Sequence, residues 1–295
     1  MTRRGFIKGL LAVMLVGLFS ALYAFFIEPA LRLRVKKWRV AHPSWPEDEA
    51  LRVVAISDLH VGEPYVGLKR VRQVVRRINA MSPDLVVLLG DYAAGHRFIT
   101  EPVQIADVAP ILAQIKAKHG VYAVLGNHDW WDDLAAQRRG GGPNLYADIL
   151  TREGIKVLSN EALQLPGTRI WLAGLEDQLA VRGPTGRWEG LDDLPGTLAQ
   201  IPKDAPAILL AHEPDIFPEV PERIALTLSG HTHGGQVRLF GWSPLVPSRF
   251  GNRYAYGHVQ EDGKSLVISG GIGCSIAPVR LGVVPEITEI SLSKA

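Results

Sequence analysis

Between residues 51 and 125 the sequence alternates between two hydrophobic periods. Short apolar runs rich in β-branched residues occupy 51–56, 84–89 and 121–125, and they have the length of buried strands. Between these runs, apolar residues recur at helical spacing over 68–78 and again over about 103–118. Strand, helix, strand, helix, strand requires right-handed crossovers, so we expect an at least partly parallel sheet.

The rest of the chain adds strands rather than helices. Further apolar runs of strand length, with Gly- and Pro-rich loops between them, occupy 155–158, 169–174, 206–211, 224–229, 265–269 and 286–292. No linker-like stretch divides 41–295. With 295 residues, of which 47% are hydrophobic, the chain can bury a large core. We therefore expect 41–295 to fold as one α/β domain.

Polar side chains directly follow five of the predicted strands. The groups are Asp58-Leu59-His60, Gly90-Asp91, Gly126-Asn127-His128-Asp129, Ala211-His212-Glu213 and Gly230-His231-Thr232-His233. Taken singly, each has an ordinary explanation: Asp91 as a helix cap, Asn127 as a turn residue, His212 as a core histidine. Five such groups are hard to explain as independent accidents, because ligands collect at the carboxyl ends of parallel strands. The pattern indicates one shared site.

The residue types in these groups are typical of a transition-metal site. His231 and His233 stand two apart, so in extended chain both project to the same face. Imidazole, amide and carboxylate donors together suit Mn, Fe or Zn better than Ca or Mg. Cys274 is the single cysteine, which excludes an internal disulfide and a cysteine-based zinc site.

An uncharged apolar segment stands near the amino terminus. Residues 9–27 would span about 28 Å as a helix, close to the thickness of a bilayer. The preceding TRRGFIK, residues 2–8, resembles a twin-arginine export signal, although an ordinary positive region before a signal helix also contains arginines. Because no A-x-A cleavage site follows, we expect 1–40 to be an uncleaved anchor with one transmembrane helix at about 9–27.

The side of the membrane on which the body lies is contested within the sequence. Three basic residues precede the apolar segment and five follow it, which favours a cytoplasmic body. The export motif favours the periplasmic side of the inner membrane and, as the more specific signal, sets our expectation. The basic residues in 32–39 could alternatively lie on anionic headgroups.

Charge is distributed unevenly along the chain. The net charge is +2 for the whole chain and +7 for 1–40, which leaves −5 for the body. The body therefore lacks the basic surface that nucleic-acid binding requires.

The order D-x-H, G-D, G-N-H-D, H, G-H-x-H resembles the calcineurin-like metallophosphoesterase superfamily over about residues 50–292. A narrower resemblance, to its membrane-anchored or exported bacterial phosphodiesterase branch, is carried by 126–131, 211–215, 230–236 and 278–287. The resemblance implies a four-layer α/β/β/α sandwich of two mixed β-sheets flanked by helices. One amino-terminal transmembrane helix would precede it.

The resemblance also implies a ligand set for two divalent metal ions. One metal would be held by Asp58, His60 and His233, the other by Asn127, His212 and His231, and Asp91 would bridge them. A metal-bridging hydroxide would then attack phosphorus. His128, beside the metals, would be the catalytic residue that stabilises the transition state or protonates the leaving group.

One position departs from the family pattern. Many members read G-D-x-x-D, with the second aspartate paired to the histidine that corresponds to His128, whereas Ala94 stands there in this chain. A weaker proton donor matters least for good leaving groups such as pyrophosphates and aryl esters. Trp130 and Trp131 could line a substrate groove and Arg280 could bind a phosphate, although packing roles are as common for such residues.

Together these features predict a membrane-anchored phosphodiesterase that hydrolyses phosphodiester or pyrophosphate bonds, with a substrate that could be linked to lipid or to the cell envelope. One alternative is a UDP-2,3-diacylglucosamine pyrophosphatase of lipid A synthesis, which needs a cytoplasm-facing site. Another is a non-catalytic module that binds lipid or cell-wall polymer, although a degraded enzyme usually loses metal ligands first.

Overall fold

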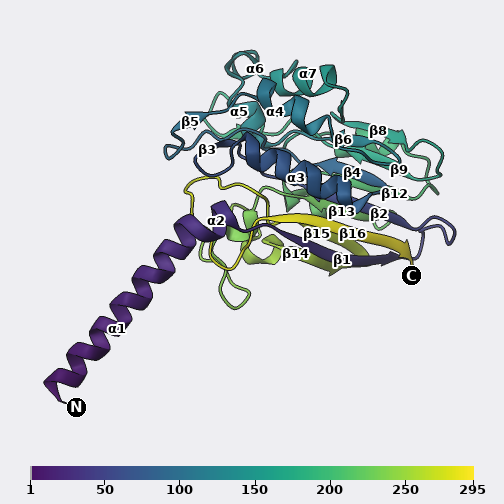
Figure 1. The fold of residues 1–295 in the computed structure, drawn as a ribbon. Helices are drawn as coiled ribbons and strands as arrows, with labels where there is room; N and C mark the ends of the chain where they lie inside the picture. The colour runs from purple at the N-terminus through teal and green to yellow at the C-terminus, as the bar shows by residue number, and fades with distance from the viewer. Residues whose placement is uncertain (1) are drawn as a thin grey trace.

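Two six-stranded sheets lie face to face in the body of the molecule (Figure 1). The computed structural model describes residues 2–295. The first sheet has the order β1-β16-β2-β4-β6-β7 and the second β14-β15-β13-β12-β9-β8. The strands of the first sheet are β1 (Arg34–His42), β2 (Leu51–Ile56), β4 (Leu85–Leu88), β6 (Val121–Ala123), β7 (Lys156–Val157) and β16 (Glu286–Lys294). Those of the second are β8 (Glu161–Gln164), β9 (Trp171–Gly174), β12 (Ala207–Leu210), β13 (Ile224–Ser229), β14 (Gly257–Glu261) and β15 (Lys264–Ile268).

The alternation in the first half of the chain produces a parallel centre. β2, β4, β6 and β7 are parallel neighbours, and β9, β12, β13 and β15 repeat this arrangement in the second sheet. Helix α3 (Leu68–Met81) connects β2 to β4, and α4 (Ile105–Leu112), shorter than the predicted 103–118, connects β4 to β6. The predicted strands occur within two residues of their expected bounds.

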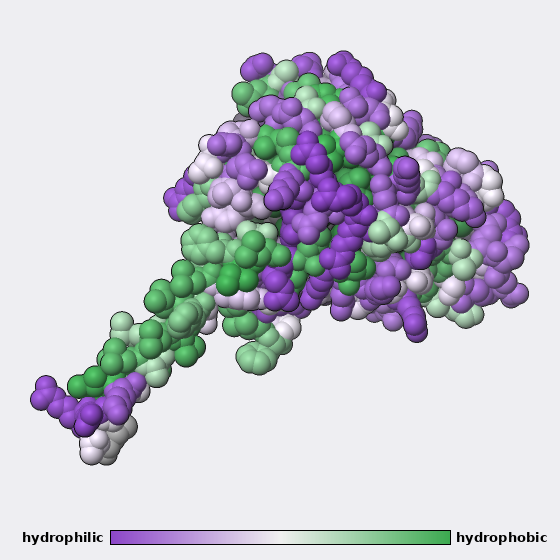
Figure 2. Space-filling model, viewed as in Figure 1, coloured by the Kyte–Doolittle hydropathy of each residue, from purple (hydrophilic) through white to green (hydrophobic). Residues whose placement is uncertain are grey.

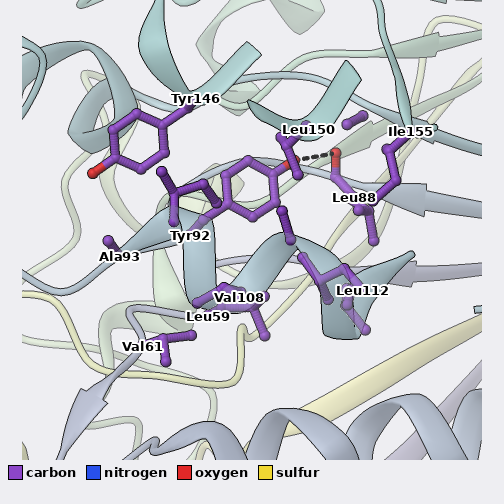
Figure 3. Packing of buried hydrophobic residues seen from close by; sticks show 14 of the residues in the cluster. Leu59, Val61, Leu88, Tyr92, Ala93, Val108, Leu112, Tyr146, Leu150 and Ile155 are labelled. Atoms are coloured by element: carbon purple, nitrogen blue, oxygen red, sulfur yellow. Dashed lines mark hydrogen bonds between the residues drawn. The ribbon is translucent and has the colours of Figure 1, made fainter. Parts of the chain in front are cut away.

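Helices cover the outer face of each sheet, which confirms the four-layer sandwich. α3, α4 and α7 (Leu145–Arg152) pack on the first sheet, and α8 (Leu194–Ala199) with the 3-10 helix Pro214–Glu219 packs on the second. Because strand side chains alternate, Val54 and Ile56 face these helices while Val53 and Ala55 face the other sheet. Figure 3 shows the helix-side core, where the Tyr92 hydroxyl donates to the Leu88 carbonyl at 3.5 Å.

Short elements surround the end of the sandwich where the chain leaves the parallel strands. They are α5 (Asn127–Trp131), α6 (Leu134–Arg139), the ribbon of β3 (Gly62–Glu63) with β5 (Glu101–Pro102), the ribbon of β10 (Val181–Arg182) with β11 (Trp188–Glu189), and two 3-10 turns at His233–Gly235 and Gly251–Tyr254.

The edge strand β1 lies in a segment that the sequence assigned to the anchor. It begins at Arg34 and pairs in parallel with β16 along its whole length, from Arg34 opposite Glu286 to His42 opposite Lys294. Arg34 bonds Glu286 at 2.9 Å and Lys37 bonds Glu289 at 3.0 Å. Residues 34–39 therefore belong to the sheet rather than to a segment free to lie on headgroups, because they pair with β16, and Arg34 and Lys37 meet acidic partners 252 residues away.

The amino-terminal helix projects from the body (Figure 1). Helix α1 (Arg3–Leu22) is exposed along its length and continues through a π-helical segment, Tyr23–Ile27, into α2 (Glu28–Leu31). The helical stretch from Arg3 to Leu31 has a mean hydropathy of 2.5 in its most apolar part, so it is long and apolar enough to cross a membrane. Figure 2 shows that apolar surface covers this helix and continues onto the body beside its base.

Candidate metal centre

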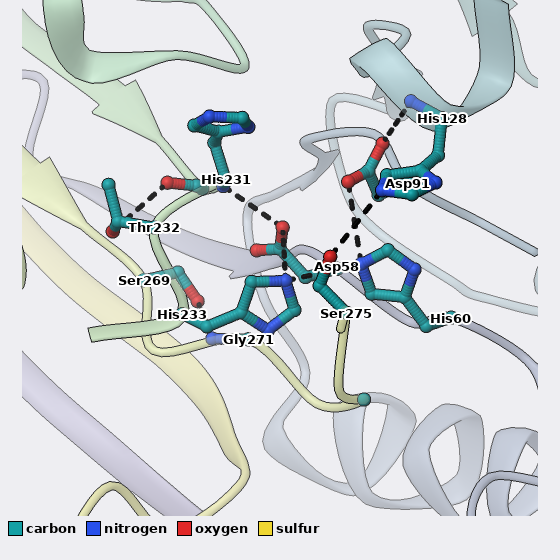
Figure 4. Close-up of polar contacts among 12 residues, drawn as sticks. Asp58, His60, Asp91, His128, His231, Thr232, His233, Ser269, Gly271 and Ser275 are labelled. Atoms are coloured by element: carbon teal, nitrogen blue, oxygen red, sulfur yellow. Dashed lines mark hydrogen bonds and ion pairs between the residues drawn. The ribbon is translucent and has the colours of Figure 1, made fainter. Parts of the chain in front are cut away.

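The polar groups that follow the strands meet at one end of the sandwich (Figure 4). Loops after β2, β4 and β6 come from the first sheet, and loops after β12 and β13 come from the second. They carry the seven side chains that the sequence singled out: Asp58, His60, Asp91, Asn127, His212, His231 and His233. Since parallel strands end at the same edge, the fold brings these donors together although they span 175 residues of sequence.

Two clusters of donor atoms share one carboxylate. In the first cluster, Asp58, His60, Asp91 and His233 each offer an atom within 4.8 Å of the others. In the second, Asp91, His212 and His231 do the same. Asn127 joins the second cluster through its Oδ1, which lies 2.9 Å from His231 Nδ1. Asp91 thus stands where a group bridging two metals must stand.

Distances within the clusters are short for groups without a cation between them. The Nε2 atoms of His60 and His233 are 3.1 Å apart, and His233 Nε2 lies 3.4 Å from Asp58 Oδ1. Asp91 Oδ2 lies 3.4 Å from His60 Nε2 and 3.3 Å from His212 Nε2. The donors converge on two neighbouring points.

The backbone at these residues is strained. Five of the seven have a positive φ: Asp58 at 51°, His60 at 40°, Asp91 at 59°, His231 at 64° and His233 at 51°. The left-handed region costs a non-glycine residue about 1–3 kcal/mol, and such strain gathers at functional sites. Strain at five neighbouring positions indicates that the fold holds these side chains for a ligand rather than for packing.

Glycine is required where the loops cross. A Cβ atom at Gly126 would lie 2.4 Å from Asp91 Oδ1 and 2.7 Å from His212 Cε1, and one at Gly230 would lie 2.7 Å from Asp58 Oδ2. All three contacts are shorter than real Cβ atoms make, so a side chain at either glycine would push a donor out of place.

The electrostatics of the donors fit divalent cations. Burial lowers the pKa of His60 to about 3, and also lowers those of His231 and His233, which leaves neutral imidazoles with a free lone pair. Burial, reinforced by the charge of Asp91, raises the pKa of Asp58 to about 6. Asp58 Oδ2 and Glu213 Oε1 are buried without a hydrogen-bond partner, which costs about 1–3 kcal/mol for each group. Divalent cations would supply the positive charge that the cluster lacks and would accept the free lone pairs of its donors.

Comparison with known proteins decides the family. Residues 51–235 match the family described as Calcineurin-like phosphoesterase. This chain belongs to that family. It is 30% identical to the uncharacterized metallophosphoesterase YkuE of Bacillus subtilis, over 99% of this chain and 98% of the relative. It is 29% identical to an uncharacterized metallophosphoesterase of Aquifex aeolicus, over 94% and 96% of the two chains.

A further relative carries a membrane description. This chain is 31% identical to a Bos taurus transmembrane protein with metallophosphoesterase domain, over 85% of this chain and 54% of the relative. Family and donor geometry together confirm a metal-dependent phosphoesterase whose clustered side chains accommodate two divalent metal ions. The preference for Mn, Fe or Zn stays a prediction.

Asp129 supports the metal centre of this phosphoesterase, a role that the sequence did not reveal. Its buried carboxylate accepts the N–H groups of Asp91 at 2.8 Å, Tyr92 at 2.9 Å and Gly126 at 2.8 Å. These bonds tie the loop after β4 to the loop after β6. Asp129 stands in the motif G-N-H-D, but only the fold shows that it accepts main-chain N–H groups whereas Asp91 faces the donor clusters.

Arg280 also supports the site and does not reach substrate space. It is completely buried and donates to the carbonyls of Gly270 at 2.8 Å, Gly273 at 3.0 Å and Val283 at 3.0 Å. Its Nη2 lies 3.3 Å from His233 Nδ1. The predicted phosphate contact is therefore wrong, because the guanidinium is enclosed by main-chain carbonyls behind the histidine.

His128 lies beside the first cluster and finds a partner other than the missing aspartate. Its main-chain N–H donates to Asp91 Oδ1 at 2.9 Å, and its ring stands 5.0 Å from that of His60. With Ala94 in the family's aspartate position, His128 Nε2 lies 3.4 Å from the hydroxyl of Ser275. No sequence motif marks Ser275, which is 147 residues away.

A cleft of about 710 Å³ opens above the clusters. Asp91, Asn127, His128, His231 and His233 are on its floor, and its other lining residues include Phe98, Trp131, Leu245, Ile276 and Val279. Of the two tryptophans predicted to line a groove, Trp131 lines this cleft and stacks on Trp188 with ring centroids 4.3 Å apart. Trp130 does not: it is buried in the helix-side core, where its indole N–H donates to Glu176.

Proposed function

We propose that this metallophosphoesterase is a membrane-anchored phosphodiesterase that hydrolyses phosphodiester or pyrophosphate bonds. The observation that carries the proposal is the pair of donor clusters sharing Asp91 on the floor of a largely apolar cleft. Asp58, His60 and His233 would hold one cation, Asn127, His212 and His231 the other, and Asp91 would bridge them. When bound, the two cations lower the pKa of water and neutralise charge on the phosphoryl oxygens.

The protein's own groups orient the reaction. The strained loops hold the donors before substrate arrives, so little reorganisation is needed at the moment of reaction. His128 stands at the cleft side of the first cluster, where it can protonate the leaving oxygen or stabilise charge that develops on it. Trp131 and Ser275 flank its ring and limit the directions in which it can turn.

The composition of the cleft favours a singly charged phosphoryl group. Arg97 is the one arginine or lysine among the residues that line it in the described part of the chain. A phosphomonoester carries up to two negative charges, whereas a diester carries one. Apolar residues such as Phe98 and Ile276 are also among the lining, so the cleft offers apolar surface to the substituents of a diester.

The residue that hydrogen-bonds His128 affects which leaving groups the site can favour. A serine hydroxyl orients the imidazole but, unlike the aspartate of the family pattern, adds no negative charge at that position, so the proposal gives His128 a smaller part in protonating the leaving group. Pyrophosphates and aryl esters, which leave with little protonation, would suffer least. This supports pyrophosphate bonds beside phosphodiesters as substrates.

Anchoring is supported by helix α1, whose apolar side chains are all exposed in the described part of the chain. We propose that residues 1–33 form the anchor, ahead of the catalytic body, and that the twin-arginine-like segment places the body on the periplasmic side of the inner membrane. A reporter enzyme fused at the carboxyl terminus tests the side: activity of a periplasm-dependent reporter is expected. Activity of a cytoplasm-dependent reporter alone would move the body to the other face.

A second candidate function is hydrolysis of a UDP-linked diacyl sugar pyrophosphate. Leu245 and Ile276 favour it, because they give the cleft an apolar mouth that could accept acyl chains. This candidate requires a cytoplasmic body, so the same reporter separates it from the first.

The test of the reaction uses the full chain, loaded in turn with Mn, Zn, Fe or Mg. Bis-p-nitrophenyl phosphate, p-nitrophenyl phosphate and a UDP-sugar lipid would be assayed with the wild type, with Asp91→Asn, and with Asp262→Asn as a matched control in an exposed turn. We expect metal-dependent turnover of the diester, lost by about 10³-fold or more in Asp91→Asn and unchanged in Asp262→Asn. Bound metal without turnover of any of the three would favour a non-catalytic module, and absence of bound metal would refute the site.

A further inference from the structure

A hairpin next to the cleft ends in an unusual turn. The backbone groups of Leu239 and Trp242 exchange hydrogen bonds of 2.9 and 3.0 Å, which leaves Phe240 and Gly241 as the turn residues. Both have a positive φ, 52° and 81°. Turns of this kind strongly prefer Asn, Asp or Gly, since a bulky side chain is disfavoured in the left-handed region. Phe240 is also fully exposed, so it gains no packing within the protein that would offset this strain.

The same molecule contains a matched turn with ordinary residues. Asp262 and Gly263 connect β14 to β15 with φ values of 49° and 75°. The backbone therefore forms this turn without an aromatic residue, and at Asp262 it uses one of the side chains that the geometry prefers. The difference at Phe240 has no structural cause in the body and points to a partner outside it.

Four other exposed apolar side chains lie on the hairpin, just after it, or on the lining of the cleft. Trp242 is 60% exposed, Leu245 64% and Ile276 70%, and Leu239 is half exposed. We name these five residues the apolar rim: Leu239, Phe240, Trp242, Leu245 and Ile276. Two of them, Leu245 and Ile276, also line the cleft, so the rim borders its mouth.

Hydrogen bonds connect the rim to the base of the anchor. Arg238, at the foot of the hairpin, donates its N–H to Leu281 O at 2.8 Å, and Leu281 donates to Gln236 O at 2.9 Å. The neighbouring Arg280 N–H donates to Ala24 O at 2.9 Å, at the end of the apolar helix. In Figure 1 the hairpin loop projects from the body on the side of α1. Whatever surrounds α1 is therefore the nearest apolar medium to the rim.

We propose that the apolar rim is a second membrane contact, which inserts into the interface of the bilayer that α1 enters and holds the mouth of the cleft against it. The inference rests on the proposed anchoring by α1. Tryptophan is typical of membrane interfaces, and an exposed phenylalanine at a hairpin tip can reach the acyl boundary. The phosphoester that reaches the metal centre would then be amphiphilic, with its hydrocarbon left in the leaflet.

The contact is tested in the full chain reconstituted into nanodiscs of phosphatidylcholine with a minority of phosphatidylglycerol. Phe240→Cys and Asp262→Cys would each carry an environment-sensitive nitrobenzoxadiazole label, and the wild type, whose single Cys274 is buried, gives the background. We expect blue-shifted emission at position 240 that nitroxide-labelled lipid quenches, and water-like, unquenched emission at 262. Equal, unquenched emission at both positions overturns the proposal. Shielding at 240 that grows with protein concentration rather than with nitroxide lipid also overturns it, in favour of a second copy of the chain.

A functional arm uses Phe240→Asn, which keeps a residue that the turn prefers, with Asp262→Asn as control and Phe240→Trp as the conservative variant. Because burial of a phenylalanine side chain shifts a partition equilibrium about ten-fold or more, we expect roughly ten-fold slower hydrolysis of a phospholipid in the nanodisc by Phe240→Asn. Turnover of bis-p-nitrophenyl phosphate should be unchanged, and Phe240→Trp should retain both activities. Equal loss on both substrates, or loss on neither, contradicts the proposal.

The outcomes distinguish failure of this proposal from failure of the proposed anchoring and of the proposed reaction. Wild type that fails to enter nanodiscs refutes anchoring by α1. Wild type that enters them but hydrolyses neither substrate refutes the proposed reaction, while the label at position 240 still reports whether the rim lies in lipid.

Discussion

The floor and the rim of the same cleft differ in burial and polarity, because the floor buries polar groups and the rim exposes apolar ones. On the floor, carboxylates and imidazoles are buried, close together and held in left-handed backbone by hydrogen bonds from behind. At the rim, apolar side chains from two segments of the chain are exposed, and one of these segments contains an unfavourable turn residue. The floor leaves buried polar atoms without partners and the rim leaves apolar side chains exposed, so a ligand that satisfies either region would stabilise it.

This difference indicates that the two regions bind different partners. Buried charge and free lone pairs are satisfied by cations. Exposed hydrocarbon is satisfied by an apolar medium. Because the needs are independent, changes on the floor should alter chemistry on every substrate, and changes at the rim should alter only the access of substrates that reside in lipid.

Metal removal should give the largest effect and should affect the floor alone. With a chelator, we expect hydrolysis to fall to background and the free energy of unfolding to drop by about 3–4 kcal/mol relative to saturating metal. The label at position 240 should stay in lipid. Activity and thermal unfolding would be followed through chelation and return of Mn. An unchanged unfolding temperature would contradict the view that buried Asp58 and Asp91 depend on cations for stability.

Arg280→Met should come next, because it removes support from the floor without touching the cleft. Three buried carbonyls lose their donor, so we expect a loss of about 3 kcal/mol or more in the free energy of unfolding. Arg138→Met, at an exposed arginine, is the matched control and should be neutral. Chemical denaturation measures both. A raised KM with unchanged stability would instead return Arg280 to the role of phosphate ligand.

The smallest effects should lie at His128 and Ser275, between floor and walls. We expect His128→Ala to lower kcat about 10²-fold for an alkyl leaving group and much less for an aryl one, with KM little changed. Ser275→Ala should show the same dependence on leaving group at only a few-fold. Ser293→Ala, exposed at the carboxyl-terminal strand, serves as control. Loss from Ser275→Ala that is equal for all leaving groups would show that the hydroxyl does not act through His128.

Much of the floor could be predicted from the sequence because it is built from local patterns. The period of the apolar residues determined strands and helices, and the polar groups at the strand ends followed from it. Their convergence then needed only the rule that parallel strands end at one edge. The predicted strand bounds agree with the observed ones to within two residues, and all seven donors lie together, because both follow from these local patterns.

The errors concern side chains whose neighbours are distant in sequence. Trp130 and Trp131 are adjacent and alike, but successive residues of a helix face different directions, so one entered the core and the other the cleft. Arg280 resembled an anion ligand because its three carbonyl partners cannot be seen as acceptors in a sequence. Arg34 and Lys37 resembled juxtamembrane charges because Glu286 and Glu289 lie more than 250 residues later.

By itself the sequence determined the alternating strands and helices, the metal-binding character of the strand ends and the apolar amino-terminal helix, since each depends on spacing along a few residues, and its motifs carried the resemblance that implied the layers of the fold. Only the tertiary structure decided that Asp129 holds the loops after β4 and β6 together, that Ser275 stands beside His128 in place of the absent aspartate, and that the apolar rim borders the cleft next to helix α1. These depend on which loops pack together at the end of two sheets, and that packing is a property of the whole chain.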